Sequence, residues 1–111
     1  MAEEMDSMLD MYLYENGQLL QQLEMTTLEK KDADSFDEGD INEFFRIMHT
    51  IKGSSGIMMF DDIMKLAHKL EDVFFYIRES KPDNVPHLEL VDKIFEVADF
   101  FRQEFESIKD G

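Results

Sequence analysis

The residues with the clearest chemical potential in this sequence lie near its centre, where a histidine is followed by a lysine and two glycines. They are His49, Lys52, Gly53 and Gly56. Residues three and four positions apart share one face of an α-helix, so a helix through this stretch places all four in one row. A neutral imidazole is a nucleophile, and a lysine ammonium can balance the charge of a phosphoryl group. The row is therefore a candidate nucleophilic site for a large anionic group.

The two glycines require a physical reason, because glycine inside a helix costs about 1 kcal/mol relative to alanine. Gly53 could be the C-terminal cap at which the helix ends. Both glycines could instead allow another helix of the same protein to pack closely. A third interpretation is that they leave one side of His49 uncovered for a partner. The local pattern leaves these three interpretations open.

The distribution of charge bears on the third interpretation. Residues 44–69 carry a net charge of +2, whereas the whole chain carries −15. A locally basic surface on an acidic protein could bind an acidic pocket of a partner protein. The alternative is that these basic side chains merely face solvent.

Four amphipathic helices are predicted, over residues 4–30, 40–59, 62–79 and 86–109, because their apolar residues recur at intervals of three and four. The apolar stripe of the first includes Met8 and Leu28. The connections are short, which favours an all-α fold, an antiparallel up-and-down four-helix bundle. The length suits one domain, 1–111, with room for at most a short extra C-terminal helix.

The starts of three helices have recognisable signals. Asp40 is the expected N-cap of the second helix, and either Asp61 or Asp62 is expected to cap the third. Pro86 lies where a proline is tolerated, just before or at the first position of the fourth helix.

Composition excludes several classes of function. There is no cysteine, which excludes disulfide scaffolds, cysteine-based zinc sites and thiol catalysis. The excess of 26 acidic over 11 basic residues argues against nucleic acid or a membrane surface as a partner. Apolar runs such as 73–77 are too short to span a bilayer, and the N-terminus lacks the features of a signal peptide. We expect a cytoplasmic protein.

The eight residues from His49 to Gly56 resemble the signature H-x-[IL]-K-G-[SG]-[AS]-G of histidine-phosphotransfer (Hpt) domains. The likeness is greatest to the N-terminal phosphotransfer domains of chemotaxis histidine kinases of the CheA type. It extends to Phe60 and to His68 and Glu71, which follow His49 by nineteen and twenty-two positions. The resemblance covers most of the chain.

The resemblance implies that His49 accepts the γ-phosphoryl group of ATP from a kinase catalytic domain. His49 would then pass it to an aspartate of a response regulator receiver domain, of the CheY or CheB kind. Gly53 and Gly56 would give these partners access. The chain would be a phosphoryl carrier and kinase substrate rather than an enzyme, with ATP and Mg²⁺ bound by its partners and no cofactor of its own. Its end at Gly111 suggests a piece of a longer CheA-like protein.

The resemblance also implies a network of side chains around the histidine. Glu71 would accept the Nδ1 proton of His49 and so leave Nε2 as the nucleophile. His68 and Lys52 would join the same hydrogen-bonded network, and Lys52 would also balance the charge of the phosphoryl group.

Two other functions compete with phosphotransfer. His49, His68 and Glu71 could bind Zn²⁺ as three protein ligands, although no His-x-x-x-His pair supports this, and we expect no metal. The chain could also be a helical adaptor that dimerises through methionine-rich faces. Such an adaptor would not need the glycines beside His49.

Overall fold

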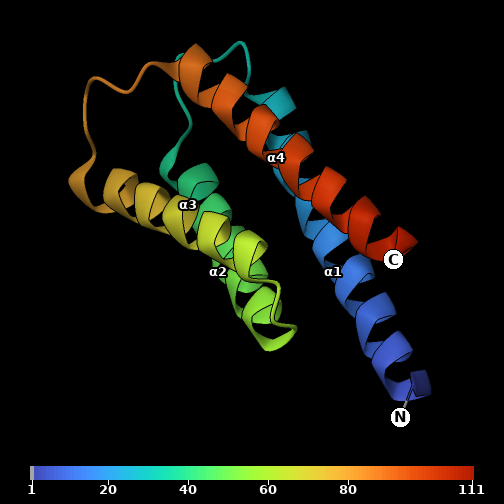
Figure 1. The fold of residues 1–111 in the computed structure, drawn as a ribbon. Helices are drawn as coiled ribbons and strands as arrows, with labels where there is room; N and C mark the ends of the chain where they lie inside the picture. Colours follow the sequence, from blue (N-terminus) through green and yellow to red (C-terminus); the bar gives the residue numbers. More distant parts are fainter. Residues whose placement is uncertain (1) are drawn as a thin grey trace.

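A computed structural model describes the backbone of residues 2–111 and the side chains of residues 7–111. The described chain consists of four helices and contains no strand (Figure 1). They are α1 (Ala2–Glu29), α2 (Glu38–Ile57), α3 (Asp61–Ser80) and α4 (His87–Asp110). Successive helices run in opposite directions, which confirms the predicted all-α, antiparallel up-and-down bundle. Met1 of the predicted 1–111 domain lies outside the described residues, and α4 continues to Asp110, so the described residues contain no separate helix after it.

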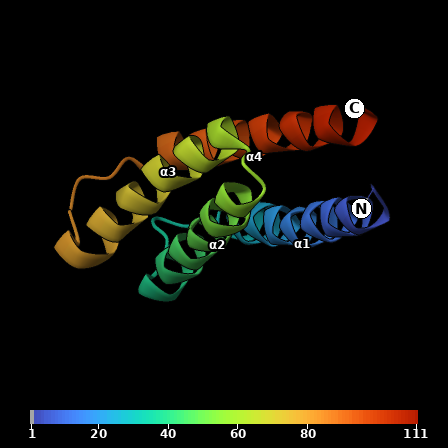
Figure 2. The ribbon, with the colours of Figure 1, turned by 60° about the horizontal axis from the view of Figure 1, so that its bottom comes forward.

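The four helices associate as two antiparallel pairs. α2 and α3 pack closely along their whole length, while α1 packs along α4 and also contacts α2 (Figure 2). The molecule is elongated, with extents of 51 × 23 × 19 Å, because the N-terminal part of α1 and the C-terminal part of α4 extend beyond the α2–α3 pair (Figure 1). None of the described helices combines the length and apolar character needed to cross a bilayer.

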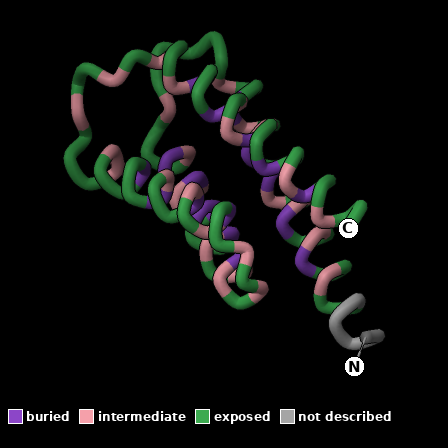
Figure 3. Tube along the Cα trace, viewed as in Figure 1, coloured by how far each residue is buried: buried purple, intermediate pink, exposed green. Residues whose placement is uncertain are grey.

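The core lies along the inner faces of all four helices (Figure 3). Its largest fully buried side chains include Leu20 and Leu23 of α1, Phe44 of α2, Phe74 of α3 and Phe101 of α4. Their spacing follows the helical period, as the sequence predicts. Together with the other buried side chains of the core, they hold the two pairs of helices together.

Two predicted core positions in α1 are wrong. Met8 and Leu28 are largely exposed, and Thr27, the neighbour of Leu28, is fully buried instead. The Thr27 hydroxyl donates to the backbone oxygen of Leu23 at 2.7 Å, so its one polar group is satisfied inside the helix. In the last turn the buried face therefore continues through a threonine, which apolar spacing alone does not reveal.

The helix starts differ from the predicted caps at two of three places. Asp37, not Asp40, is the N-cap of α2: its side chain accepts from the Asp40 backbone N–H, and the Asp40 side chain accepts from the Asp37 N–H. This is a capping box, in which Asp40 holds the third helical position. α3 has Phe60 at its N-cap position, and Asp61 and Asp62 fall in its first turn. Pro86 directly precedes α4, as predicted.

Two serines in the unusual stretch of α2 connect that helix to α1. The buried hydroxyls of Tyr12 and Ser55 are 2.7 Å apart, and burial raises the pKa of Tyr12, although the hydrogen bond to Ser55 opposes this. Ser54 donates to the buried side chain of Asn16 at 3.2 Å. These polar contacts are directional, so they fix the register between α1 and the helix that carries His49.

We expect Ser55→Ala to lower the free energy of unfolding by about 1–2 kcal/mol, because it leaves the buried Tyr12 hydroxyl without its partner. Tyr12→Phe removes the other member of the pair. The double variant is expected to lose less stability than the sum of the two single variants. Urea denaturation of the four proteins measures this coupling, and strictly additive losses would contradict the contact.

Candidate functional site

His49 lies on the outer face of α2, which continues as a helix through Gly53 and Gly56 to Ile57. The predicted row of four residues on one helix face is therefore present. The side chain of His49 is 64% exposed. A large partner can reach its ring from solvent.

The carboxylate of Glu71 bridges α3 to this row. Its Oε2 lies 2.5 Å from Nδ1 of His49, and its Oε1 accepts a hydrogen bond from Nζ of Lys52 at 2.8 Å. The Glu71 side chain is only 10% exposed. Both of its oxygens are thus engaged by two residues that α2 presents one turn apart.

The state of ionisation of Glu71 decides which nitrogen of His49 is nucleophilic. Burial by itself raises the pKa of the Glu71 carboxyl, but hydrogen bonds from Lys52 and His49, together with their charges, outweigh it and leave the pKa below its ordinary value of 4.5. Near pH 7 the carboxylate can only accept, so the hydrogen bond assigns a proton to Nδ1. In the neutral ring Nε2 then carries the free lone pair, and none of the described residues hydrogen-bonds it.

Lys52 takes part in the network around His49, as the resemblance implies. One N–H of its ammonium is directed to Glu71, and the resemblance also assigned the group to the charge of a phosphoryl ligand. A lysine ammonium has three donors, so its contact with Glu71 leaves two for an anion beside His49.

His68 shares a face of α3 with Glu71, but the structure does not bring it into hydrogen-bond contact with His49. Its side chain is exposed, and its Nε2 lies 3.9 Å from Oδ2 of Asp72, one turn further along α3. That distance exceeds a hydrogen bond. Among the described side chains the network around the imidazole therefore consists of His49, Lys52 and Glu71.

The third histidine, His87, has a structural contact. Its Nε2 lies 2.7 Å from the backbone oxygen of Lys30, so Nε2 carries a proton and donates to the residue that follows α1. Its ring also packs edge-on against Phe36, with 4.7 Å between centroids. His87 thus ties the start of α4 to the end of α1.

The two glycines differ in their surroundings. A Cβ added to Gly53 would meet no atom within 4 Å beyond its own helix, whereas one added to Gly56 would lie 3.3 Å from Sδ of Met64. The cap of α2 is Met58, not Gly53. For Gly53 this rules out capping and close packing and leaves access to His49. For Gly56 a packing contact with α3 is present as well.

The three residues of the competing Zn²⁺ hypothesis, His49, His68 and Glu71, do not form one cluster of possible ligands. Among the described side chains, the acidic and histidine groups that come within 4.8 Å of one another are His68, Glu71 and Asp72, without His49. The Glu71 carboxylate in this group is already bound by His49 and Lys52. A metal ion would have to compete with both for it.

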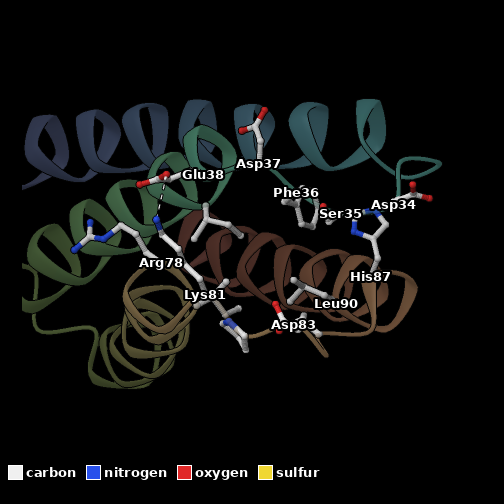
Figure 4. A pocket seen from close by; sticks show the side chains of 14 residues that line it. Asp34, Ser35, Phe36, Asp37, Glu38, Arg78, Lys81, Asp83, His87 and Leu90 are labelled. Atoms are coloured by element: carbon white, nitrogen blue, oxygen red, sulfur yellow. Dashed lines mark ion pairs between the residues drawn. The ribbon is translucent and has the colours of Figure 1, made fainter.

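A cavity of about 440 Å³ lies at another part of the bundle, between the α1–α2 and α3–α4 connections (Figure 4). Both acidic and basic side chains line it, and Lys81 and Glu38 face each other across it at 3.9 Å. None of the residues predicted for the site lines this cavity. The candidate site is an exposed helix face, not a pocket.

Phe45 is a neighbour of His49 that the sequence pattern did not single out. Its ring lies nearly parallel to the imidazole, with 6.2 Å between centroids and 17° between planes. Its place four residues before His49 on the same helix is the signal that could have identified it.

The sequence model of the Hpt domain matches residues 7–110. The chain belongs to the Hpt domain family. As an Hpt domain it is a phosphoryl carrier rather than an enzyme.

Individual relatives agree with the family. The chemotaxis protein CheA of Halobacterium salinarum is 33% identical over 95 residues, which are 86% of this chain and 14% of that protein. The chemotaxis protein CheA of Bacillus subtilis is 33% identical over 110 residues, 97% of this chain and 16% of that protein. The chain thus spans about one seventh of the length of these curated relatives. The structure of the CheA phosphotransferase domain from Thermotoga maritima superimposes with a TM-score of 0.77 at 35% identity, covering 90% of this chain and 92% of that one.

The lowered pKa of Glu71 predicts a dependence of stability on pH. A carboxyl group whose pKa falls on folding stabilises the fold above its ordinary pKa of 4.5, and that contribution is lost as the pH falls through the folded-state value. We expect Glu71→Gln to lower the free energy of unfolding by about 1 kcal/mol at neutral pH and by less at pH values below 4.5. Urea denaturation over a series of pH values measures the difference.

The matched control for this prediction is Glu96→Gln, which alters an exposed glutamate of α4. Its effect on stability should be small throughout the pH range. A loss in Glu71→Gln that persists undiminished in acid would show that the contacts of Glu71 do not depend on its charge.

Proposed function

We propose that His49 is the phosphorylated residue and that Nε2 is the nitrogen that takes part in transfer. The observation that carries this proposal is the hydrogen bond from Nδ1 to the buried carboxylate of Glu71. It leaves the lone pair of Nε2 on a ring that solvent and partners can reach. Histidines elsewhere in the chain, His68 and His87, have no comparable contact with a buried carboxylate.

The proposed reaction has two steps. The Nε2 lone pair of His49 attacks the γ-phosphorus of ATP, the bond from phosphorus to the bridging oxygen breaks, and ADP leaves. The ring gains positive charge as the new bond forms, and the Glu71 carboxylate at Nδ1 stabilises that charge. In the second step a receiver aspartate attacks the same phosphorus, the N–P bond breaks, and the electron pair returns to the ring.

We infer that ATP and Mg²⁺ are held by the partners rather than by this chain. The sequence has no glycine-rich loop with phosphate-binding spacing and no Asp/Asn set placed to hold the metal of a kinase. The proposed donor is the catalytic domain of a CheA-type kinase. The proposed acceptors are receiver domains of the CheY or CheB kind. The names of the relatives support a chemotaxis relay within a longer cytoplasmic protein.

The alternative of a helical adaptor explains less of the site. It gives no reason for Gly53, beside which there is open space, or for a histidine and a lysine that share one buried carboxylate. Phosphotransfer accounts for both features.

We expect His49→Gln to fold normally and to accept no phosphoryl group, because the nucleophile is lost. His68→Gln is the matched control, since His68 is also exposed and lies on the facing helix. The measurement is transfer of labelled phosphate from ATP in the presence of a CheA-type catalytic core. The product should be labile in acid and stable in base. Normal labelling of His49→Gln would disprove the assignment.

Gly53→Leu is expected to slow phosphorylation of His49 without lowering the stability of the helix. Leucine favours a helix over glycine by about 0.5–1 kcal/mol, and the space beside Gly53 is open, so stability should be retained or increased. The new side chain would stand one turn from the imidazole and should slow phosphorylation at least about tenfold, or 1.4 kcal/mol.

Gly17→Leu is the control for this comparison. Gly17 lies inside α1, and a Cβ there also meets nothing within 4 Å. Its substitution should change stability similarly and leave transfer unchanged. Normal transfer in Gly53→Leu would mean that Gly53 does not serve access.

A further inference from the structure

The contacts of Phe45 concern how the ring of His49 is oriented. The hydrogen bond to Glu71 holds one edge of the imidazole, but the torsion that turns a histidine ring is broad and roughly twofold. The side chain is 64% exposed, so little protein surrounds it. A single hydrogen bond at Nδ1 therefore leaves freedom in the direction of the Nε2 lone pair.

Phe45 supplies a second contact. The two rings are nearly parallel, at 17° and 6.2 Å between centroids, within the range of offset stacking. Phe45 and His49 are one turn apart on α2, so the contact restrains the face of the imidazole while Glu71 restrains its edge. Transfer in line with the scissile bond depends on such alignment.

Phe45 is itself held from α3. The guanidinium carbon of Arg78 lies 4.4 Å from the centroid of Phe45 and 5.3 Å from that of Phe75. Arg78 also donates to Oδ1 of Asn42 at 3.0 Å. A planar cation against an aromatic face is an attractive arrangement that lysine does not reproduce. A continuous set of contacts therefore runs from Arg78 through Phe45 to His49.

We propose that Phe45 is a positioning residue for phosphotransfer at His49, and that Arg78 acts on the reaction by holding Phe45 in place. This inference rests on the proposed function of His49. It adds a requirement for the orientation of the ring, distinct from the control of its tautomer by Glu71.

Kinetics of phosphorylation by a CheA-type catalytic core test the proposal. We expect Phe45→Leu to lower kcat about three- to tenfold, as the loss of an aromatic pair would, with little change in KM for the domain. Phe45→Tyr keeps the ring and should restore kcat to within about twofold of the wild type. Phe100→Leu, which removes a partly exposed aromatic ring of α4, is the control and should have no effect.

A double-variant cycle tests the role of Arg78. Arg78→Gln is expected to lower kcat alone, and to lower it no further in a Phe45→Leu background, because its effect passes through that ring. Independent, multiplicative effects would show that Arg78 acts on the partner directly and would overturn this part of the proposal. A rise in KM at constant kcat for Phe45→Leu would identify a docking contact instead, and also overturn it.

NMR of the domain without the kinase gives a separate readout. Phe45→Leu should shift the ring protons of His49, because a neighbouring aromatic ring is removed, while the nitrogen spectrum still shows the proton on Nδ1. Unchanged ring-proton shifts would refute the contact, whatever the kinetics show. If the wild-type domain accepts no phosphoryl group at all, the proposed function fails, and this spectrum still decides whether Phe45 orients the ring.

Discussion

The site depends on the placement of one carboxylate, that of Glu71, between two helices. The group is almost fully buried, which would favour its neutral form, yet hydrogen bonds from Lys52 and His49 keep its pKa below the ordinary value. Breaking either contact would leave a buried charge with one partner fewer, which is costly. The same carboxylate links α3 to α2 and fixes the proton on one nitrogen of His49. The hydrogen bonds of the Glu71 carboxylate thus contribute both to the packing of α2 on α3 and to the nucleophilicity of His49.

The rest of the bundle supports this interaction by fixing where α2 lies. The polar contacts of Ser54 and Ser55 with α1 set the register of the segment that carries His49. Gly56 permits close approach of Met64 on α3. Serines and glycines weaken a helix in isolation, but here each has a tertiary contact or, at Gly53, open space. The composition that makes this stretch unusual as a helix is what suits it to the site.

Much of the fold followed from the sequence, and the errors have local causes. Periodicity predicted the four helices to within a few residues, because burial on one face imposes spacing of three and four. It failed at Met8, which is exposed, and at Leu28, next to which a threonine bonded to its own helix is buried instead. The N-cap of α2 was wrong because two aspartates near its start could cap, and the choice between Asp37 and Asp40 depends on the path of the preceding chain. At α3 both predicted aspartates lie in the first turn, after Phe60 at the N-cap position.

The sequence by itself determined the row of His49, Lys52, Gly53 and Gly56, because the helical period alone places them on one face. Its resemblance to the Hpt family pointed to Glu71 as the acceptor of the Nδ1 proton and to His68 as a further member of the network. Only the tertiary structure separated the two: Glu71 points into the α2–α3 interface, while His68 is directed to solvent and Asp72. Spacing along α2 already places Phe45 one turn before His49. The contact of Arg78 with Phe45 became visible only in the tertiary structure, because contacts between helices depend on register and side-chain reach, which spacing along one helix does not contain.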